Sequence, residues 1–122
     1  MAKRIVVIED NRDILDLIAY ILADLGYEVT GYLHLESMEK ILTDQPCLVL
    51  LDHKLATGNG SDLCLAIKSD PLTSLIPVIL VSASSNIATI AKKCSADGFL
   101  SKPFDLEDLI AVVKDHCDTA IH

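Results

Sequence analysis

The 122-residue chain has no apolar run that approaches the roughly 20 residues of a membrane-spanning helix. Its start, from Met1 to Ile5, leads directly into a strand-like run and not into a signal sequence, so we expect a cytoplasmic protein. Basic residues are also few, because ten Lys and Arg stand against eighteen Asp and Glu, for a formal net charge of −8 at pH 7. Such a surface repels phosphate backbones and anionic lipid headgroups, so we expect this chain alone to bind neither nucleic acid nor a membrane.

The sequence also lacks the glycine motifs of nucleotide-binding loops and hydrolases. It contains no G-x-x-x-x-G-K-[ST] loop, no G-x-G-x-x-G after its first strand-like run and no G-x-S-x-G turn. Gly58 and Gly60 suit positive-φ positions in a turn better than a phosphate cradle. These absences argue against nucleotide or serine hydrolysis and predict no bound organic cofactor.

The four cysteines, Cys47, Cys64, Cys94 and Cys117, lie far apart and form no C-x-x-C pair. Each stands in an apolar stretch with no histidine at the spacing of a metal site. His116 adjoins Cys117, but neighbouring residues of a helix point in different directions and would not share a metal ion. We therefore expect all four cysteines to be buried, reduced thiols.

Strand-like and helical patterns alternate five times along the chain. Ile5 to Ile8 is a continuous β-branched run, typical of a strand buried on both faces. Apolar residues then follow at helical spacing, with Asn11 as the expected N-cap and Gly26 as the end of the helix. Further strands are expected near residues 27–32, 48–51, 77–81 and 98–101, and further helices near 35–42, 63–67, 87–94 and 106–113, the last capped by Asp105.

This alternation predicts the fold class. Strands that are apolar throughout need helices on both faces of a parallel sheet, and the chain is too short for an eight-unit barrel. We expect a single α/β domain over residues 1–122, with its core at about 4–117: a doubly wound (βα)5 fold with a five-stranded parallel sheet. In open sheets of this kind, the groups that do chemistry gather beyond the carboxyl ends of the strands.

Polar side chains follow four of the five expected strands. Glu9 and Asp10 follow the first, Asp52 the third, Ser82 the fourth and Lys102 the fifth. Carboxylates crowded at one edge repel one another, so such a site needs protonation or a bound cation at neutral pH. An oxygen-only ligand set suits a hard ion, and Mg²⁺ is the ion that we expect.

A carboxylate beside Mg²⁺ can also attack a phosphoryl group and form an aspartyl phosphate. Lys102 offers a positive charge for a phosphoryl oxygen, and Ser82 offers a hydroxyl donor. Each residue alone has a simpler interpretation, since Asp10 or Asp52 could cap a helix or lie in a solvated loop, Lys102 could lie on the surface, and Ser82 could cap a helix. Their convergence at one sheet edge favours phosphoryl chemistry.

Four motifs resemble, in order and spacing, those of the receiver domains of bacterial two-component response regulators. Residues 5–11 (IVVIEDN) resemble the family's first strand with its acidic pair, and residues 48–52 (LVLLD) the strand that carries the phosphoacceptor. Residues 78–83 (VILVSA) resemble the fourth strand with its hydroxyl residue, and residues 99–104 (FLSKPF) the switch aromatic followed by Lys-Pro. The resemblance covers Arg4 to about Val113 and implies a flavodoxin-like sheet of order 2-1-3-4-5.

The resemblance implies a role for each site residue. Asp52 would accept a phosphoryl group from a histidine kinase or a histidine phosphotransfer protein. Asp10 would bind Mg²⁺ directly, Glu9 mainly through a metal-bound water, and Lys54 through its backbone carbonyl. Such a domain is not an enzyme with a separate substrate, because it catalyses only its own phosphorylation and dephosphorylation.

The resemblance also implies a switch. Lys102 would pair with the phosphoryl group, Ser82 would move to hydrogen-bond it, and Phe99 would swing inward into the vacated space. The Lys102-Pro103 bond is often cis in this family. The face made by the fourth helix, fifth strand and fifth helix would then contact a downstream output domain or protein.

Two other functions remain open as alternatives. A phosphorylation-independent pseudo-receiver would act through partner contact alone, and it would normally lack an acidic, hydroxyl or lysine position that is present here. A Mg²⁺-dependent phosphatase or mutase with an Asp nucleophile would need D-x-D after the first strand, where this chain has Asp10-Asn11-Arg12. Gly98 and Glu107 stand where symmetric-dimer receivers commonly have Asp and Arg, so a dimer of that type is not expected.

Overall fold

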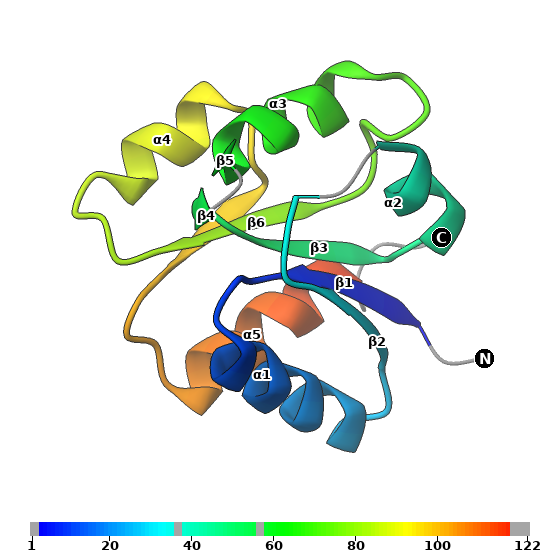
Figure 1. Cartoon of the computed structure of the whole chain (residues 1–122), viewed down its shortest axis with the longest axis vertical. Helices are drawn as coiled ribbons and strands as arrows, with labels where there is room; N and C mark the ends of the chain where they lie inside the picture. Colours follow the sequence, from blue (N-terminus) through cyan, green and yellow to red (C-terminus); the bar gives the residue numbers. More distant parts are fainter. Residues whose placement is uncertain (1–2, 36–37, 56–57, 118–122) are drawn as a thin grey trace.

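The computed structural model describes residues 3–35, 38–55 and 58–117. Figure 1 shows a twisted sheet between two layers of helices. In the described residues the strands are β1 (Arg4–Ile8), β2 (Glu28–Tyr32), β3 (Leu48–Asp52), β4 (Lys54–Leu55), β5 (Gly58–Asn59), β6 (Val78–Ser82) and β7 (Gly98–Ser101). The helices are α1 (Arg12–Asp24), α2 (Met38–Asp44), α3 (Gly60–Ser69), α4 (Ile87–Lys93) and α5 (Leu106–Cys117).

The main sheet has the strand order β2-β1-β3-β6-β7, and every neighbouring pair is parallel. Counted among the five strands of this sheet alone, the order is 2-1-3-4-5, so the predicted fold is confirmed. The pattern did not predict β4 and β5, which form a small antiparallel pair after β3. Strands of two residues are too short to produce a period in the sequence.

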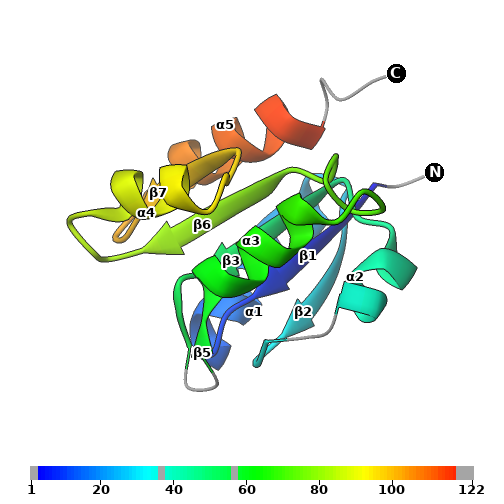
Figure 2. The same ribbon diagram turned by 90° about the horizontal axis from the view of Figure 1, so that it is seen from above.

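The alternation of side chains along each strand divides the core between the two faces of the sheet. Ile5 and Val7 pack on the side of α1 and α5, whereas Val6 and Ile8 pack on the side of α2, α3 and α4. Figures 1 and 2 show the same division of the helices. Every residue of β3 and β6 is buried, as a strand covered on both faces requires. None of the described helices is long and apolar enough to cross a membrane.

Two helices have the N-cap residues that the sequence predicts. Asn11 Oδ1 accepts a hydrogen bond from the Ile14 amide at 3.1 Å, which caps α1. Asp105 Oδ1 accepts one from the Asp108 amide at 2.9 Å and caps α5. Because α1 starts this close behind β1, the residues between them are held in a short connection at the sheet edge.

The prediction of four reduced thiols is wrong for one pair of cysteines. Cys47 and Cys117 form a disulfide with a Cα–Cα distance of 5.2 Å, while Cys64 and Cys94 are free and buried. The bonded residues are separated by 70 positions. They meet because α5 packs against β3 and ends beside the residue that precedes that strand. This proximity depends on the tertiary fold, which no cysteine spacing reveals.

Candidate functional site

Parallel pairing of β1, β3, β6 and β7 brings four predicted site residues to the carboxyl edge of the sheet. Glu9 follows β1, Asp52 ends β3, Ser82 ends β6 and Lys102 follows β7. The Lys102 amide donates to the Ser82 carbonyl at 2.8 Å, which holds the last two strand ends together. The side chains therefore meet because their strands are neighbours, although up to 93 positions separate them in the sequence.

Three carboxylates lie together at this edge. Glu9, Asp10 and Asp52 each offer one oxygen, and these atoms all lie within 4.8 Å of one another. Glu9 and Asp52 are buried, with 3% and 7% of their surface exposed, whereas Asp10 is open to solvent. An all-oxygen donor set with one exposed member fits a hard divalent cation that approaches from solvent. The residues thus fit the predicted Mg²⁺.

Lys102 is the positive charge that faces these carboxylates. Its Nζ donates to Glu9 Oε1 at 2.8 Å and to Asp52 Oδ2 at 3.4 Å. Burial lowers the pKa of Lys102, but its hydrogen bond to Glu9 and the negative charges of Asp52 and Glu9 outweigh burial and raise that pKa above its ordinary value. The lysine is therefore firmly protonated and bound to both acids.

Even so, the charge of Lys102 does not balance that of the acids. Burial, followed by the hydrogen bond and negative charge of Glu9, raises the pKa of Asp52 to about 7, although Lys102 acts in the opposite direction. Without a cation, the Asp52 carboxyl is consequently protonated in a sizeable fraction of molecules near neutral pH. A second positive charge at the edge would restore the carboxylate.

A hollow of about 350 Å³ opens beside Asp52, and its lining consists of Asp52, Lys54, Ser82, Ala83, Ser84 and Lys102. Ser82 is buried in this lining, and its Oγ accepts a hydrogen bond from the Ser84 amide at 3.0 Å. Since α4 begins only at Ile87, the Ser82 hydroxyl closes a local turn and does not cap the helix. The hollow joins a carboxyl, a hydroxyl and an ammonium group around a space that admits a phosphoryl group.

The connection after β3 contains two residues that sequence reasoning missed. A Cβ at Gly60 would overlap the Asp52 carbonyl oxygen, so only glycine lets α3 begin so close to the end of β3. The Gly60 amide donates to the His53 carbonyl at 2.6 Å and closes this turn. His53 itself is buried, and its Nδ1 has no hydrogen-bond partner among the described residues. The Gly58–Gly60 spacing signals a turn but not this close approach.

Phe99 is the predicted site residue that lies neither in the acidic cluster nor in the lining of the hollow. It lies in β7 opposite Leu80, and 43% of its surface is exposed. Its ring therefore lies outward, in the position from which the predicted inward movement would start. The Lys102-Pro103 bond is cis, as the resemblance implies. For Lys54, the side chain is exposed and lines the hollow, while metal binding by its carbonyl stays a prediction.

Comparisons with known proteins show the family to which the chain is similar. The family model described as response regulator receiver domain matches residues 5–114. A probable transcriptional regulatory protein of Picosynechococcus is 37% identical over 116 residues, which cover 88% of this chain and 46% of that protein. A solved CheY-like receiver domain protein of Methanospirillum hungatei is 29% identical with a TM-score of 0.86, over 97% of this chain and 95% of that chain.

The solved receiver domain of a signal transduction histidine kinase from Syntrophus aciditrophicus is 25% identical, with a TM-score of 0.87. The match covers 98% of this chain and 92% of that chain. The chain spans about half the length of the curated relatives that it matches.

The raised pKa of Asp52 predicts a pH dependence of stability in the metal-free protein. Because the carboxyl has a pKa of about 7 in the fold and an ordinary value of 3.8, the folded state binds more protons than the unfolded state between these values. The contribution of Asp52 to the free energy of unfolding is therefore greatest at low pH and falls as the pH rises from about 4 to about 7. Urea unfolding with EDTA, repeated across this range, measures the effect.

Asp52→Asn provides the comparison, because the amide keeps the shape of the side chain and does not titrate. Subtracting the variant from the wild type removes the effect of the acids that do not interact with residue 52. The variant should become the more stable protein, relative to wild type, as the pH approaches neutrality. Parallel pH curves for the two proteins would contradict the raised pKa.

Proposed function

Since the chain belongs to the response regulator receiver domain family, we propose that it receives a phosphoryl group on Asp52 from a histidine kinase or a histidine phosphotransfer protein. The observation that carries the proposal is the position of Asp52 between an acidic cluster and the hollow that Lys102 and Ser82 line. In this proposal the domain has no separate substrate, because it catalyses only its own phosphorylation and its later dephosphorylation. We place the proposed reaction in the cytoplasm.

The proposed transfer is a displacement at phosphorus. A carboxylate oxygen of Asp52 forms a bond to the phosphorus atom of a phosphohistidine, the P–N bond breaks, and the imidazole nitrogen leaves and takes up a proton from solvent. Lys102, now bound to Glu9 and Asp52, lies where its ammonium group can turn toward a phosphoryl oxygen. Ser82 contributes a hydroxyl donor, because an Oγ that accepts from the Ser84 amide still has its own hydrogen to donate.

Glu9, Asp10 and Asp52 are the side chains that would hold Mg²⁺, with the Lys54 carbonyl as a further ligand. When bound, this ion supplies positive charge that offsets the negative charge of the carboxylate and the phosphoryl oxygens. Asp10 is exposed and can meet a hydrated ion first, whereas buried Glu9 is held by Lys102 and by the Asn11 amide, which donates to Glu9 Oε2 at 3.2 Å.

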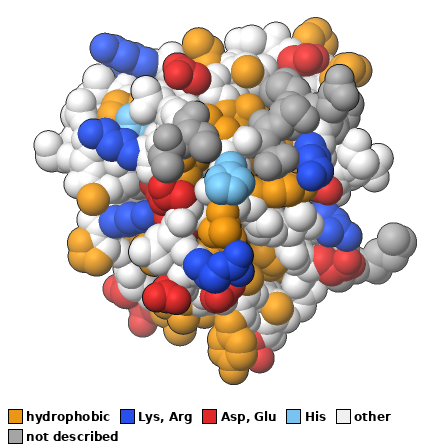
Figure 3. All heavy atoms as spheres, viewed as in Figure 1, with side chains coloured by type: hydrophobic (Ala, Val, Ile, Leu, Met, Phe, Trp, Pro, Cys, Tyr) orange, Lys and Arg blue, Asp and Glu red, His pale blue; other side chains and the backbone are white. Residues whose placement is uncertain are grey.

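A protein phosphodonor also needs a surface near Asp52, and we propose the apolar hollow beside Lys102. This hollow, of about 380 Å³, is lined by Ile14, Leu17, Ala83, Lys102, Pro103 and Phe104. It shares Ala83 and Lys102 with the phosphoryl-binding hollow, so a protein that covers it would hold its phosphohistidine close to Asp52. Figure 3 shows apolar side chains projecting at the lower edge of the molecule, where α1 lies.

For the output partner, we propose the face made by α4, β7 and α5. Ser82 ends β6 and Phe99 lies on the adjacent strand β7, so a shift of the hydroxyl toward a phosphoryl group opens space beside the ring. The ring is 43% exposed and Leu106, at the start of α5, is 52% exposed, which leaves apolar surface that burial or a partner can cover.

The alternative is a pseudo-receiver that binds partners without being phosphorylated. This alternative involves the same fold and the same docking face, but no phosphorylation of Asp52. Phosphorylation by a small donor therefore separates the two functions.

Incubation with phosphoramidate and Mg²⁺ should add one phosphoryl group to the chain, because the nucleophile, the acidic cluster and the lysine are all in place. Intact-mass spectrometry measures the product. Asp52→Asn should show no added mass, and Asp13→Asn, which removes an exposed acid from the first turn of α1, should behave as wild type.

Mg²⁺ should also stabilise the protein by roughly 2.7 kcal/mol at a hundredfold excess over Kd. A protein that Mg²⁺ stabilises but that gains no phosphoryl mass would support the pseudo-receiver. Equal labelling of wild type and Asp52→Asn would show that another residue is modified.

Leu17→Asp should slow phosphoryl transfer from a phosphohistidine-bearing protein by about tenfold, the effect of losing about 1.4 kcal/mol of docking energy. It should leave phosphorylation by phosphoramidate unchanged, because Leu17 does not line the hollow beside Asp52. Leu75→Asp alters another exposed leucine, away from this hollow, and serves as the control. Equal transfer rates for Leu17→Asp and wild type would reject the docking surface.

Beryllofluoride, which imitates a phosphoryl group, should change the amide chemical shifts of residues 87–94 and 99–110 as well as those around Asp52. The expected coupling is on the order of 1–3 kcal/mol, or about 5- to 150-fold in the affinity of a partner. Phe99→Ala should reduce the shifts on α4 and α5 while beryllofluoride still binds. Changes confined to the loops around Asp52, Ser82 and Lys102 in the wild type would rule out this output face.

A further inference from the structure

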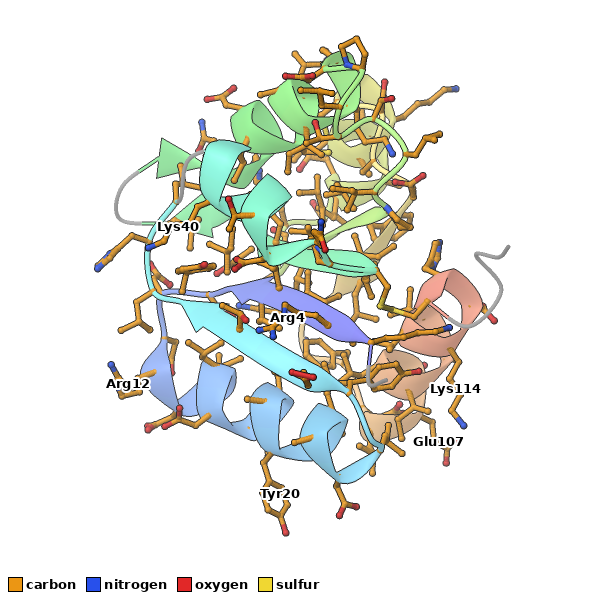
Figure 4. All side chains as sticks on the ribbon, turned by 90° about the vertical axis from the view of Figure 1, so that its right-hand side faces the viewer. Arg4, Arg12, Tyr20, Lys40, Glu107 and Lys114 are labelled. Atoms are coloured by element: carbon orange, nitrogen blue, oxygen red, sulfur yellow. A yellow bond between two sulfur atoms is a disulfide. The ribbon has the colours of Figure 1, made fainter. Side chains whose placement is uncertain are left out.

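The two cysteine pairs of the chain have contrasting surroundings. Cys64 on α3 and Cys94 at the end of α4 are buried in the core, where burial raises the pKa of the Cys64 thiol far above its ordinary value. Cys47 and Cys117 are joined at the opposite end of the sheet from Asp52. Figure 4 shows their sulfur–sulfur bond in yellow beside the end of α5.

The disulfide meets the surface through Cys47, which is half-buried, whereas Cys117 is only 1% exposed. Cys47 and Cys117 both line a hollow of about 360 Å³ together with Lys3, Pro46, Pro71, Leu72, Leu75, Ile76 and Pro77. Lys3 Nζ donates to the Cys117 carbonyl at 2.7 Å and so helps to hold the end of α5 at this hollow. An external thiol can therefore reach the bond from the side of half-buried Cys47.

We propose that Cys47 and Cys117 form a reversible thiol–disulfide pair whose oxidation state controls how firmly the C-terminal end of α5 is held against the sheet. For reduction, one thiolate of an external dithiol attacks a sulfur of the Cys47–Cys117 bond and forms a mixed disulfide, and the other cysteine leaves as a thiolate. The second thiol of the dithiol then closes its own disulfide, so two electrons and two protons pass to the protein. Oxidation is the reverse exchange, with a small disulfide such as oxidised glutathione as the electron acceptor.

Reversibility agrees with the location that we propose for the phosphoryl transfer. Disulfides in the reducing cytoplasm are usually transient and not permanent supports. The disulfide is not the only attachment of α5 to the sheet, because Leu109 and Val113 of this helix are also buried in the core. Reduction should consequently loosen the last turn of α5 while the helix itself and the distant phosphoacceptor edge stay folded.

Alkylation of the native full chain with N-ethylmaleimide, read by peptide mass spectrometry, tests the pair. After mild oxidation no cysteine should be labelled. After treatment with dithiothreitol Cys47 should be labelled first, and Cys117, which is 1% exposed, should be labelled more slowly as the last turn of α5 opens. Cys64 and Cys94 should react only after denaturation and thus serve as internal controls. Labelling of Cys47 and Cys117 without reductant, after oxidation, would overturn the proposal.

The same readout in mixtures of reduced and oxidised glutathione tests reversibility. The cross-linked fraction should change with the ratio of the two forms and return when the ratio is reversed. A bond that persists at every ratio in the native protein would be a permanent support and would overturn the proposal.

A parallel experiment replaces glutathione with a thioredoxin-type protein dithiol. Comparing the two rates of disulfide reduction at equal thiol concentration distinguishes a protein reductant from a small one.

Hydrogen exchange measures the effect on α5. Amides of residues 112–117 should exchange about tenfold faster in the reduced chain than in the oxidised chain, while β3 and β6 remain unchanged. Cys47→Ser should exchange like the reduced chain whether or not dithiothreitol is present. Equal exchange in the oxidised and reduced wild type would show that the bond does not hold the helix. These readouts do not depend on phosphorylation of Asp52, so they can fail or succeed independently of the proposed function.

Discussion

The site depends on one shared ion pair, in which a single lysine faces two buried carboxylates. Lys102 bonds to Glu9 and Asp52 from the end of β7, which lies three places from β1 and two from β3, so it connects the edge of the sheet to the centre. Because one positive charge cannot balance two buried negative charges, the edge retains a demand for a cation or a proton, and the raised pKa of Asp52 expresses that demand. A phosphoryl group would alter this balance by drawing the ammonium group away from Glu9.

The fold makes this balance possible by leaving the strand ends little freedom to relax. β3 and β6 are buried along their whole length, so neither strand can slide to separate the charges. Behind Asp52, the absence of a side chain at Gly60 lets the first residue of α3 lie against the Asp52 carbonyl and limits movement of this backbone from the other side. The carboxylates therefore cannot move apart, as they could in a mobile loop. Their mutual repulsion persists and favours the binding of a cation.

Strand composition was enough to predict the sheet and the residues that follow its strands, because buried parallel strands leave long apolar runs and their polar ends stand out. The motifs added the sheet order and the residue roles. The β4–β5 pair could not be predicted from runs of two residues, and Gly60 signalled a turn without revealing its contact with the Asp52 carbonyl. The prediction for Cys47 and Cys117 was wrong because their meeting depends on where α5 ends in space, a long-range property absent from local sequence.

One end of α5 adjoins the proposed phosphoryl site, and the other end carries the disulfide. Leu106 begins the helix three residues after the cis-proline that follows Lys102, so this end adjoins the proposed phosphoryl site. Cys117 ends the helix at the disulfide, where the chain is tied to the residue before β3. In the oxidised chain the bond at Cys117 would restrain the last turn of α5 against any movement that starts at the proposed phosphoryl site, and reduction would remove this restraint. The redox state of the pair would thus set how far a change at Asp52 can move the output face.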